Sequence, residues 1–555
     1  GLAQEMGIDP SRVGGHINAD LRIEMPLSDD LVIDDVIVRF GADLRDVSIS
    51  SDALPSVFNN RGVSDGNLAA MMDSETFYLS GDVVVGGTPL EITWQHNFKS
   101  PPAEFRRRID VTGRLDEDDR AAFGIDDTRL SGVLDFELHL VDHDGSSISG
   151  DVIVDLTPTA LDVPALAWSK PPGGPGRARI GFELAPDGDL RGGIAFAVEA
   201  EGLKAAGIAE MTPSRDGLAA IAFHRLDSGL NQGMATITFN ADGGYDVRLA
   251  AESLDLRPHQ KAWGESDDAD WPPIKISGVV DNIILEGDAT MRDIDGEVTV
   301  RDGRIESARI EGFVGDGDPF TFRLGQTAGK REFLLSSENA GAVFKALGVY
   351  DRMSGGRLLA TGVIHDDRPD GATEGTVVVD DFHVVNAPLL AKMLTIATVT
   401  GALEMLDGKG LPFRHLEAPF VYRDDLVTLT DVRASGLSVG FTLDGTIDLG
   451  DDAQPVDFSG TIIPAYAINS ALGHIPLLGK ILTGGEGEGM FAALYRVEGP
   501  MDDTRVSVNP LAVLAPGILR QLFTIFESSG EAAPANGATP HGPAANGETV
   551  PQTSR

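Results

Sequence analysis

The 555-residue sequence contains no cysteine. Disulfides, thiolate metal sites and thiol nucleophiles are therefore excluded together. Basic residues are also scarce, because 44 lysines and arginines stand against 86 acidic residues and leave a formal net charge of -42 at pH 7. A surface this acidic repels the phosphate backbone, so no nucleic-acid partner is expected.

Long apolar runs are missing as well. The best candidate, residues 387–406, is interrupted by Lys392 and Glu404, so no transmembrane helix is expected. The first residue is glycine, and no basic segment followed by an apolar one opens the chain. We therefore expect the sequence to be a fragment that lacks an N-terminal anchoring segment.

What the sequence does contain is alternation. From the start to about Ser336, apolar and polar residues mostly alternate in short runs, which is typical of half-buried antiparallel strands. Examples are Ile92, Trp94, His96 and Phe98; Val152, Val154 and Leu156; Ile180, Phe182 and Leu184; and Ile194, Phe196 and Val198. Asp-Gly pairs at 144–145, 187–188, 242–243, 302–303 and 444–445 predict tight hairpin turns. With 66 glycines and only 6% aromatic residues, we expect a mainly β protein with an elongated, curved antiparallel sheet.

After Ser336 the pattern changes, and short helical segments are predicted among the strands at 340–347, 388–406, 464–482 and 510–526. Residues 528–555 are rich in Ala, Pro, Gly and Ser and predict a disordered tail. The expected organisation is a β-groove region at 1–335, a region with a few short amphipathic helices at 336–527, and the tail at 528–555.

No motif predicts catalysis. Residues 473–480 resemble a phosphate loop, but the spacing is one residue too long and Ile481 replaces the required Ser or Thr. Residues 142–145 favour a hairpin turn over a calcium loop, and His139 and His143 lie on a strand pattern that separates them by about 13 Å. We therefore expect no enzyme activity, no metal and no cofactor.

Two sets of apolar residues are candidate lipid contacts. Strict alternation marks the first set as one face of a strand, which could be either a closed core or a lipid groove: Leu437, Val439, Phe441, Leu443, Ile447 and Leu449. The second set belongs to the helical segments and could form a lid over the sheet or touch a membrane: Leu389, Leu390, Met393, Leu472, Ile475, Leu477, Leu478, Ile481 and Leu482.

The segment from about Ser336 to Phe526 resembles the C-terminal region of AsmA-like proteins, in particular the YhdP branch. The resemblance is carried, in order, by residues 338–341 (Glu-Asn-Ala-Gly), 355–358 (Gly-Gly-Arg-Leu), 385–390 (Val-Asn-Ala-Pro-Leu-Leu), 460–466 (Gly-Thr-Ile-Ile-Pro-Ala-Tyr), 475–479 (Ile-Pro-Leu-Leu-Gly), 495–500 (Tyr-Arg-Val-Glu-Gly-Pro) and 508–511 (Val-Asn-Pro-Leu). It covers about a third of the chain.

The resemblance implies a bridge-like lipid-transfer protein, anchored in the inner membrane and reaching through the periplasm toward the outer membrane. The expected partners are phospholipid or another acyl lipid, both membrane surfaces and other envelope proteins. The alternative is a non-enzymatic envelope scaffold or outer-membrane assembly factor that binds partners through its sheet edge.

Overall fold

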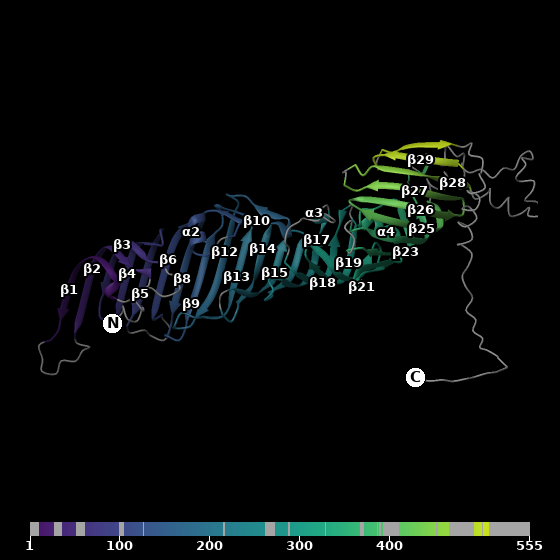
Figure 1. Cartoon of the computed structure of the whole chain (residues 1–555). Coiled ribbons are helices and arrows are strands. Elements are labelled where there is room, and N and C mark those ends of the chain that lie inside the picture. The colour runs from purple at the N-terminus through teal and green to yellow at the C-terminus, as the bar shows by residue number, and fades with distance from the viewer. Residues whose placement is uncertain are drawn as a thin grey trace, which may run out of the picture. The chain divides into compact units, whose positions relative to one another are not determined.

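The computed structural model describes residues 10–26, 36–51, 61–98, 105–125, 127–214, 217–260, 272–286, 289–327, 329–366, 371–385, 387, 390–391, 410–450, 453–464, 493–501 and 503–509. In this part of the chain, 27 strands belong to one sheet and three strands form a second sheet. Helices are few and short (Figure 1). The expected class, a mainly β protein built on a large curved sheet that does not close, is confirmed.

The chain divides into two compact units, which are described separately. Unit 1 comprises residues 1–351 and 361–367, and unit 2 comprises residues 352–360 and 368–555. The division falls within β23 (Met353–Ile364). The predicted division was between residues 335 and 336, and the predicted tail lies outside the described residues.

Unit 1 is a succession of strands in which each pairs with the next one of the main sheet. The strands are β1 (Val13–Glu24), β2 (Ile37–Ile49), β3 (Val63–Met72), β4 (Thr76–Val85), β5 (Thr88–Asn97), β6 (Arg107–Leu115), β8 (Leu134–Asp142), β9 (Ile148–Asp155), β12 (Gly176–Leu184), β13 (Leu190–Ala200), β14 (Leu203–Met211), β15 (Leu218–Ser228), β16 (Asn231–Phe239), β17 (Tyr245–Asp255), β18 (Ile274–Ile284), β19 (Thr290–Arg301), β20 (Arg304–Val314), β21 (Asp318–Thr327) and β22 (Lys330–Ser337). Each added strand widens a sheet by about 4.8 Å, so the unit extends mainly across its strands.

The pairing of β17 with β18 departs from the antiparallel expectation. These two strands run parallel, with Tyr245 aligned with Ile274. Strand β17 therefore ends at one long edge of the sheet, and β18 begins at the other. The other pairs described in unit 1 are antiparallel, as between β12 and β13 or between β20 and β21.

The two long edges of the unit 1 sheet differ in structure. At the first, hairpins close by turns such as residues 143–147, 185–189 and 240–244, and we call it the turn edge. At the second, the capped edge, the chain makes excursions after β6, β9, β17 and β22. They form α2 (Glu117–Ala122), the small sheet of β7 (Leu130–Gly132), β10 (Thr159–Val163) and β11 (Trp168–Lys170), then α3 (Arg257–Gln260) and α4 (Ala340–Ala346). In Figure 1, α2, β10 and α3 lie along the same long edge.

Unit 2 has a closely packed apolar face. Its strands are β24 (Thr373–Val384), β25 (Leu411–Arg423), β26 (Leu426–Gly436), β27 (Val439–Asp448), β28 (Val456–Pro464), β29 (Ala493–Gly499) and β30 (Arg505–Asn509), and consecutive strands pair antiparallel. On this face the ring of Phe382 stacks on Phe413 with centroids 5.2 Å apart, and Phe413 meets Phe441 edge to face at 5.5 Å. Phe382 and Phe413 are both buried.

Four of the five predicted Asp-Gly turns are confirmed. The glycines at 145, 188, 243 and 303 have positive φ in loops between strands. The fifth prediction is wrong, because Asp444 and Gly445 lie inside β27 and continue its alternation. The helix predicted at 340–347 is confirmed by α4, whereas most of the helical segments predicted at 388–406, 464–482 and 510–526 lies outside the described residues.

Candidate functional site

One face of the unit 1 sheet is mainly apolar, and one apolar row on it is unbroken from the first strand to the last. A single row of directly paired residues crosses every strand of the main sheet in this unit, and directly paired residues share a face. The row runs Ile17, Leu44, Leu68, Gly81, Ile92, Val111, Leu138, Val152, Ile180, Phe196, Gly207, Phe223, Ala235, Leu249, Gly278, Gly296, Ile310, Phe322 and Leu335. Every member is either an apolar residue or a glycine.

The burial of this face increases toward the capped edge. Near that edge lie fully buried side chains, namely Leu115, Leu156, Leu203, Leu285 and Val314, each at most 7% exposed. Along the row and toward the turn edge, large side chains stay partly exposed, among them Ile180, Phe196, Phe223, Ile237 and Leu249. A second sheet packed on this face would bury such residues as it does in a β-sandwich. The face is therefore closed at the capped edge, and from β12 to β17 it stays accessible from the turn edge. At β5 and β8 the turn edge is buried as well, with Trp94 5%, His96 7% and Asp142 4% exposed.

Glycines keep the open face smooth. Phe136, Phe182 and Phe196 lie over Gly113, Gly150 and Gly207 of neighbouring strands, where an added Cβ would overlap the phenyl ring. Each ring thus occupies the space that a side chain would take on the next strand. These three phenyl rings therefore lie low on the face.

The cap at α2 and the small sheet packs onto the apolar face itself. Phe123, Leu130 and Leu161 from the cap contact the cluster of Leu115, Leu134 and Leu156, all on or beside the main sheet. Helix α2 begins with a reciprocal capping box in which the Asp116 side chain accepts from the backbone N–H of Asp119. The apolar contacts show how this stretch of the capped edge is closed.

Two buried cations hold the cap. The Arg120 side chain, 3% exposed, donates to the carbonyl oxygens of Leu130 (3.0 Å) and Gly132 (3.2 Å). The Lys170 ammonium donates to the carbonyl oxygens of Thr159 (2.7 Å) and Gly174 (2.9 Å), and burial lowers the pKa of Lys170. Both charges satisfy backbone carbonyls that would otherwise be buried without a donor.

The opposite face of the sheet is polar and carries ion pairs. Guanidinium and carboxylate groups meet across neighbouring strands at Arg114–Asp135 (2.6 Å), Arg179–Asp151 (2.8 Å) and Arg323–Glu311 (3.2 Å). Hydrogen bonding to Asp135 raises the pKa of Arg114, and hydrogen bonding to Asp151 does the same for Arg179. These pairs keep the polar face in water and so fix which side of the sheet is apolar.

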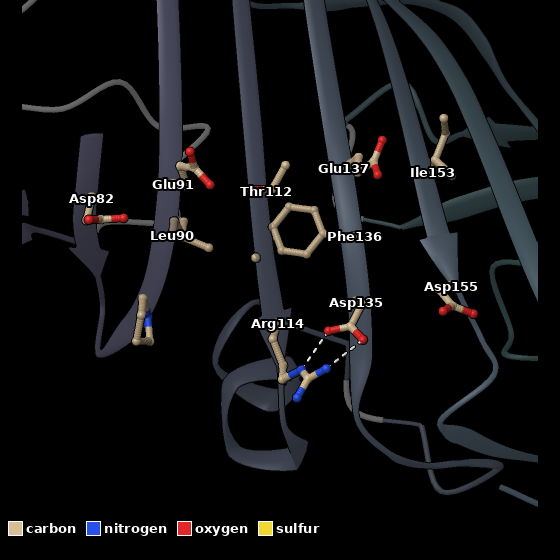
Figure 2. Close-up of a pocket in the computed structure, with 12 residues that line it drawn as sticks. Asp82, Leu90, Glu91, Thr112, Arg114, Asp135, Phe136, Glu137, Ile153 and Asp155 are labelled. Atoms are coloured by element: carbon tan, nitrogen blue, oxygen red, sulfur yellow. Dashed lines mark hydrogen bonds and ion pairs between the residues drawn. The ribbon is translucent and has the colours of Figure 1, made fainter. Parts of the chain in front are cut away.

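A hollow of about 630 Å³ lies on this polar face over β4, β5, β6, β8 and β9 (Figure 2). Its wall includes five carboxylates, those of Asp82, Glu91, Asp135, Glu137 and Asp155, and Arg114 is engaged with Asp135. Within the described ranges, no group of His, Asp and Glu side chains is arranged to hold a metal ion. The hollow is therefore an acidic surface depression.

The predicted groove residues of the sequence analysis fall on β27 and its flanks in unit 2. Val439, Phe441, Leu443 and Ile447 share one face of this strand. Val439 is fully buried, and the other three are partly exposed. Leu437 and Leu449 lie just outside the strand and are 58% and 44% exposed. The structure thus brings four of the six together.

Of the predicted lid or membrane-contact residues, Leu390 is buried. The others lie outside the described residues: Leu389, Met393, Leu472, Ile475, Leu477, Leu478, Ile481 and Leu482. None of the described helices is long and apolar enough to cross a membrane.

The more open apolar face is that of unit 1, from which the sequence analysis selected no site residue. The signal was present, because the alternating runs at Ile180, Phe182 and Leu184 and at Ile194, Phe196 and Val198 do place their apolar residues on this face. What the alternation did not reveal is that the face stays partly exposed. Comparison of the chain with protein-family models, curated proteins and solved structures finds no match.

Proposed function

We propose that the chain is a lipid-transfer conduit of the bacterial envelope, in which acyl chains lie along the apolar face of unit 1. The observation that carries the proposal is the unbroken apolar row from Ile17 to Leu335, which crosses every main-sheet strand of the unit. A binding site for one small ligand needs only a few strands. A surface that repeats the same chemistry on each strand suits an elongated ligand or a series of ligands that move along it.

The energetics favour acyl chains as the occupants. Each methylene that leaves water gains about 0.8 kcal/mol, so a chain of about sixteen carbons gains on the order of 12 kcal/mol on a sheltered path. The open turn edge allows head groups to stay in water while the tails contact residues such as Ile180 and Phe223. Where phenyl rings lie over glycines, as at Gly113, Gly150 and Gly207, the face presents no tall side chain to a lipid that moves along it.

The resemblance of residues 336–526 to AsmA-like proteins of the YhdP branch supports a place in the periplasm. In this proposal the protein is attached to the inner membrane and carries phospholipid between the inner and outer membranes. No catalytic residue takes part, and no cofactor is needed. The strong negative charge keeps the polar face solvated along the whole path.

The test is direct detection of bound lipid and of its transfer. The purified chain is incubated with phospholipid vesicles, re-isolated, extracted and analysed by mass spectrometry, and transfer of a fluorescent lipid between two vesicle populations is followed. We expect several lipids per chain and transfer that falls in an Ile180→Glu, Phe196→Glu double variant. A wild-type chain that retains no lipid and transfers none would overturn the proposal.

A second candidate, an envelope scaffold, is favoured by the edge strand β1. All twelve residues of this strand are exposed, and among the described strands it pairs with β2 alone. An exposed strand edge can add a strand from another protein by backbone hydrogen bonds. A Leu21→Pro variant separates the two functions, since it would abolish strand addition at β1 and leave lipid binding at Ile180 and Phe196 intact.

A further inference from the structure

One row of charged residues interrupts the apolar face of unit 1, at the turn edge. In this row His96 pairs with Arg107, and Arg107 pairs with Asp142. Two residues further along the same strands, Trp94 pairs with Ile109, and Ile109 pairs with Leu140. No register shift separates the two rows, so Arg107 lies on the same face as these apolar residues.

The contacts of Arg107 leave most of its donors accessible to a ligand. Its side chain is 23% exposed, and its described polar contact is a single one of 3.4 Å to Oδ2 of Asp142. A guanidinium carries five N–H donors, and this contact uses one. The carboxylate of Asp142 is fixed by the turn that follows, because its Oδ1 accepts a 2.6 Å hydrogen bond from the backbone N–H of Gly145.

Other positions on the turn edge lack this feature. The apolar face ends there in the apolar pairs Leu184–Leu190, Met211–Leu218 and Phe239–Tyr245. A second arginine, Arg331, also lies on this face near the edge. Its Nε and Nη2 donate to the two carboxylate oxygens of Asp366, and its Nη1 donates to the carbonyl oxygen of Ile305. Arg107 therefore differs from Arg331 in having few contacts, and from its neighbours along the edge in having a charge.

We propose that the partly exposed Arg107 binds the phosphate of a phospholipid head group at the turn edge, with the acyl chains of that lipid lying on the apolar face beside the partly exposed Ile109 and Leu140. The inference rests on the proposed function, to which it adds a binding site for the head group. A guanidinium fork matches two phosphate oxygens, and a charge-assisted contact of this kind is among the stronger hydrogen bonds in proteins. Arg107 and Ile109 are two residues apart on the same face of β6, so one lipid can place its head group at Arg107 and its tails at Ile109.

Carboxylates near Arg107 can meet the ammonium of a zwitterionic head group, and the Arg106 guanidinium also reaches the turn at Gly145. Asp142 and Asp144 lie in or beside the adjacent turn, and Asp144 is exposed. Hydrogen bonds from the side chain and backbone of Ser146 lower the pKa of Asp144, so this carboxylate stays charged at neutral pH. An ammonium group beside the phosphate would meet these carboxylates.

The experiment compares Arg107→Gln with Arg114→Gln in the full chain. Arg114 lies on the polar face near the other end of the same strand and is paired with Asp135, so it serves as the control. Both variants and the wild type are incubated with vesicles that contain phosphatidylethanolamine, phosphatidylglycerol or diacylglycerol as the labelled lipid. The lipid retained per chain after re-isolation is then measured, together with thermal unfolding.

We expect Arg107→Gln to retain about tenfold less phosphatidylethanolamine, as follows from the loss of one charge-assisted contact of about 1.4 kcal/mol. Its retention of diacylglycerol, which has no phosphate, should be unchanged, and Arg114→Gln should behave as the wild type. Equal loss of all three lipids would show that Arg107 only supports the structure, and unchanged phosphatidylethanolamine would show that it plays no part; either result overturns the inference. If the wild type retains diacylglycerol and Arg107→Gln does not change the retention of any lipid, the conduit proposal is supported and the Arg107 site is refuted. If the wild type retains none of the lipids, both the conduit proposal and the Arg107 site are refuted.

Discussion

The phenyl ring of Phe182 on β12 lies directly over Gly150 on β9, at the place where any side chain on residue 150 would stand. Gly150 is buried by this contact. The ring therefore covers the backbone of Gly150, and the apolar face of unit 1 has no protruding side chain at this point. The same relationship joins Phe196 to Gly207 and Phe136 to Gly113.

A Gly150→Val substitution tests whether lipid transfer requires a face without a protruding side chain at this position. The added side chain forces Phe182 up from the face, and overpacking of this kind typically costs about 1–3 kcal/mol. We expect lower stability in urea unfolding and slower lipid transfer between vesicles. Gly181→Ala is the control, because residue 181 is on the polar face with no atom within 4 Å of an added Cβ. Transfer at the wild-type rate in a folded Gly150→Val protein would contradict the role of the smooth face.

A Phe441→Glu substitution tests whether the apolar face at β27 is a closed core. Phe441 is partly exposed and contacts Phe413, which is 2% exposed, so a carboxylate here would lie against the aromatic rings of the packed face. We expect unit 2 to lose several kcal/mol of stability in thermal or urea unfolding. Thr446→Glu, on the polar face of the same strand, should have little effect; Thr442 is less suitable because its hydroxyl accepts from the backbone N–H of Thr461. A stable Phe441→Glu protein that has lost lipid contact would instead place β27 in the conduit.

An Arg120→Ala substitution tests how the cap is held. It leaves the carbonyl oxygens of Leu130 and Gly132 buried without their charged donor, which should cost about 2–4 kcal/mol locally. Hydrogen exchange should become faster in residues 115–134 and stay slow in β15 to β17. Arg129→Ala is the control, since Arg129 is paired with Asp127 at the surface and should change stability by less than about 1 kcal/mol. Equal effects of the two variants would refute the role given to Arg120.

The Arg331–Asp366 pair should make the stability of the fold depend on pH. Hydrogen bonds from Arg331 are the main reason that the pKa of Asp366 lies below its usual 3.8. Because the folded-state pKa is depressed, the stabilisation is complete above about pH 4 and is lost as the pH falls toward and through the folded-state value. The stability difference between wild type and Asp366→Asn should therefore be largest near neutral pH and shrink below pH 4. A difference that stays constant down to pH 2 would contradict this assignment.

The face of each strand could be predicted from the sequence more reliably than the exposure of that face. Alternation at Ile180, Phe182 and Leu184 follows from the side-chain period of a strand, which is a local property. Exposure depends on what packs above the strand, and the same alternation occurs at the half-open Ile180 and at the fully buried Val439. For this reason the sequence analysis selected β27 and passed over unit 1.

Other differences also have local causes. Helix α2 has only six residues, too few for a helical period to stand out, although Asp116 and Asp119 form a capping box that the sequence contains. Gly445 was taken as a turn residue because it follows an aspartate, yet within β27 it pairs with Phe458. The position of Arg107 on the apolar face depends on the register of β6 with β5 and β8, which is set by pairing and not by the segment itself.

Ile180 and Arg179 offer the most direct test of whether lipid occupies the apolar face of unit 1. These neighbours on β12 point to opposite faces, Ile180 within the apolar row and Arg179 paired with Asp151 on the polar face. A photo-crosslinking amino acid is placed at each position in turn, the protein is exposed to phospholipid vesicles and irradiated, and lipid adducts are measured by mass spectrometry. We expect an acyl-lipid adduct at position 180 and none at position 179. The absence of an adduct at position 180, or equal adducts at both positions, would contradict the account.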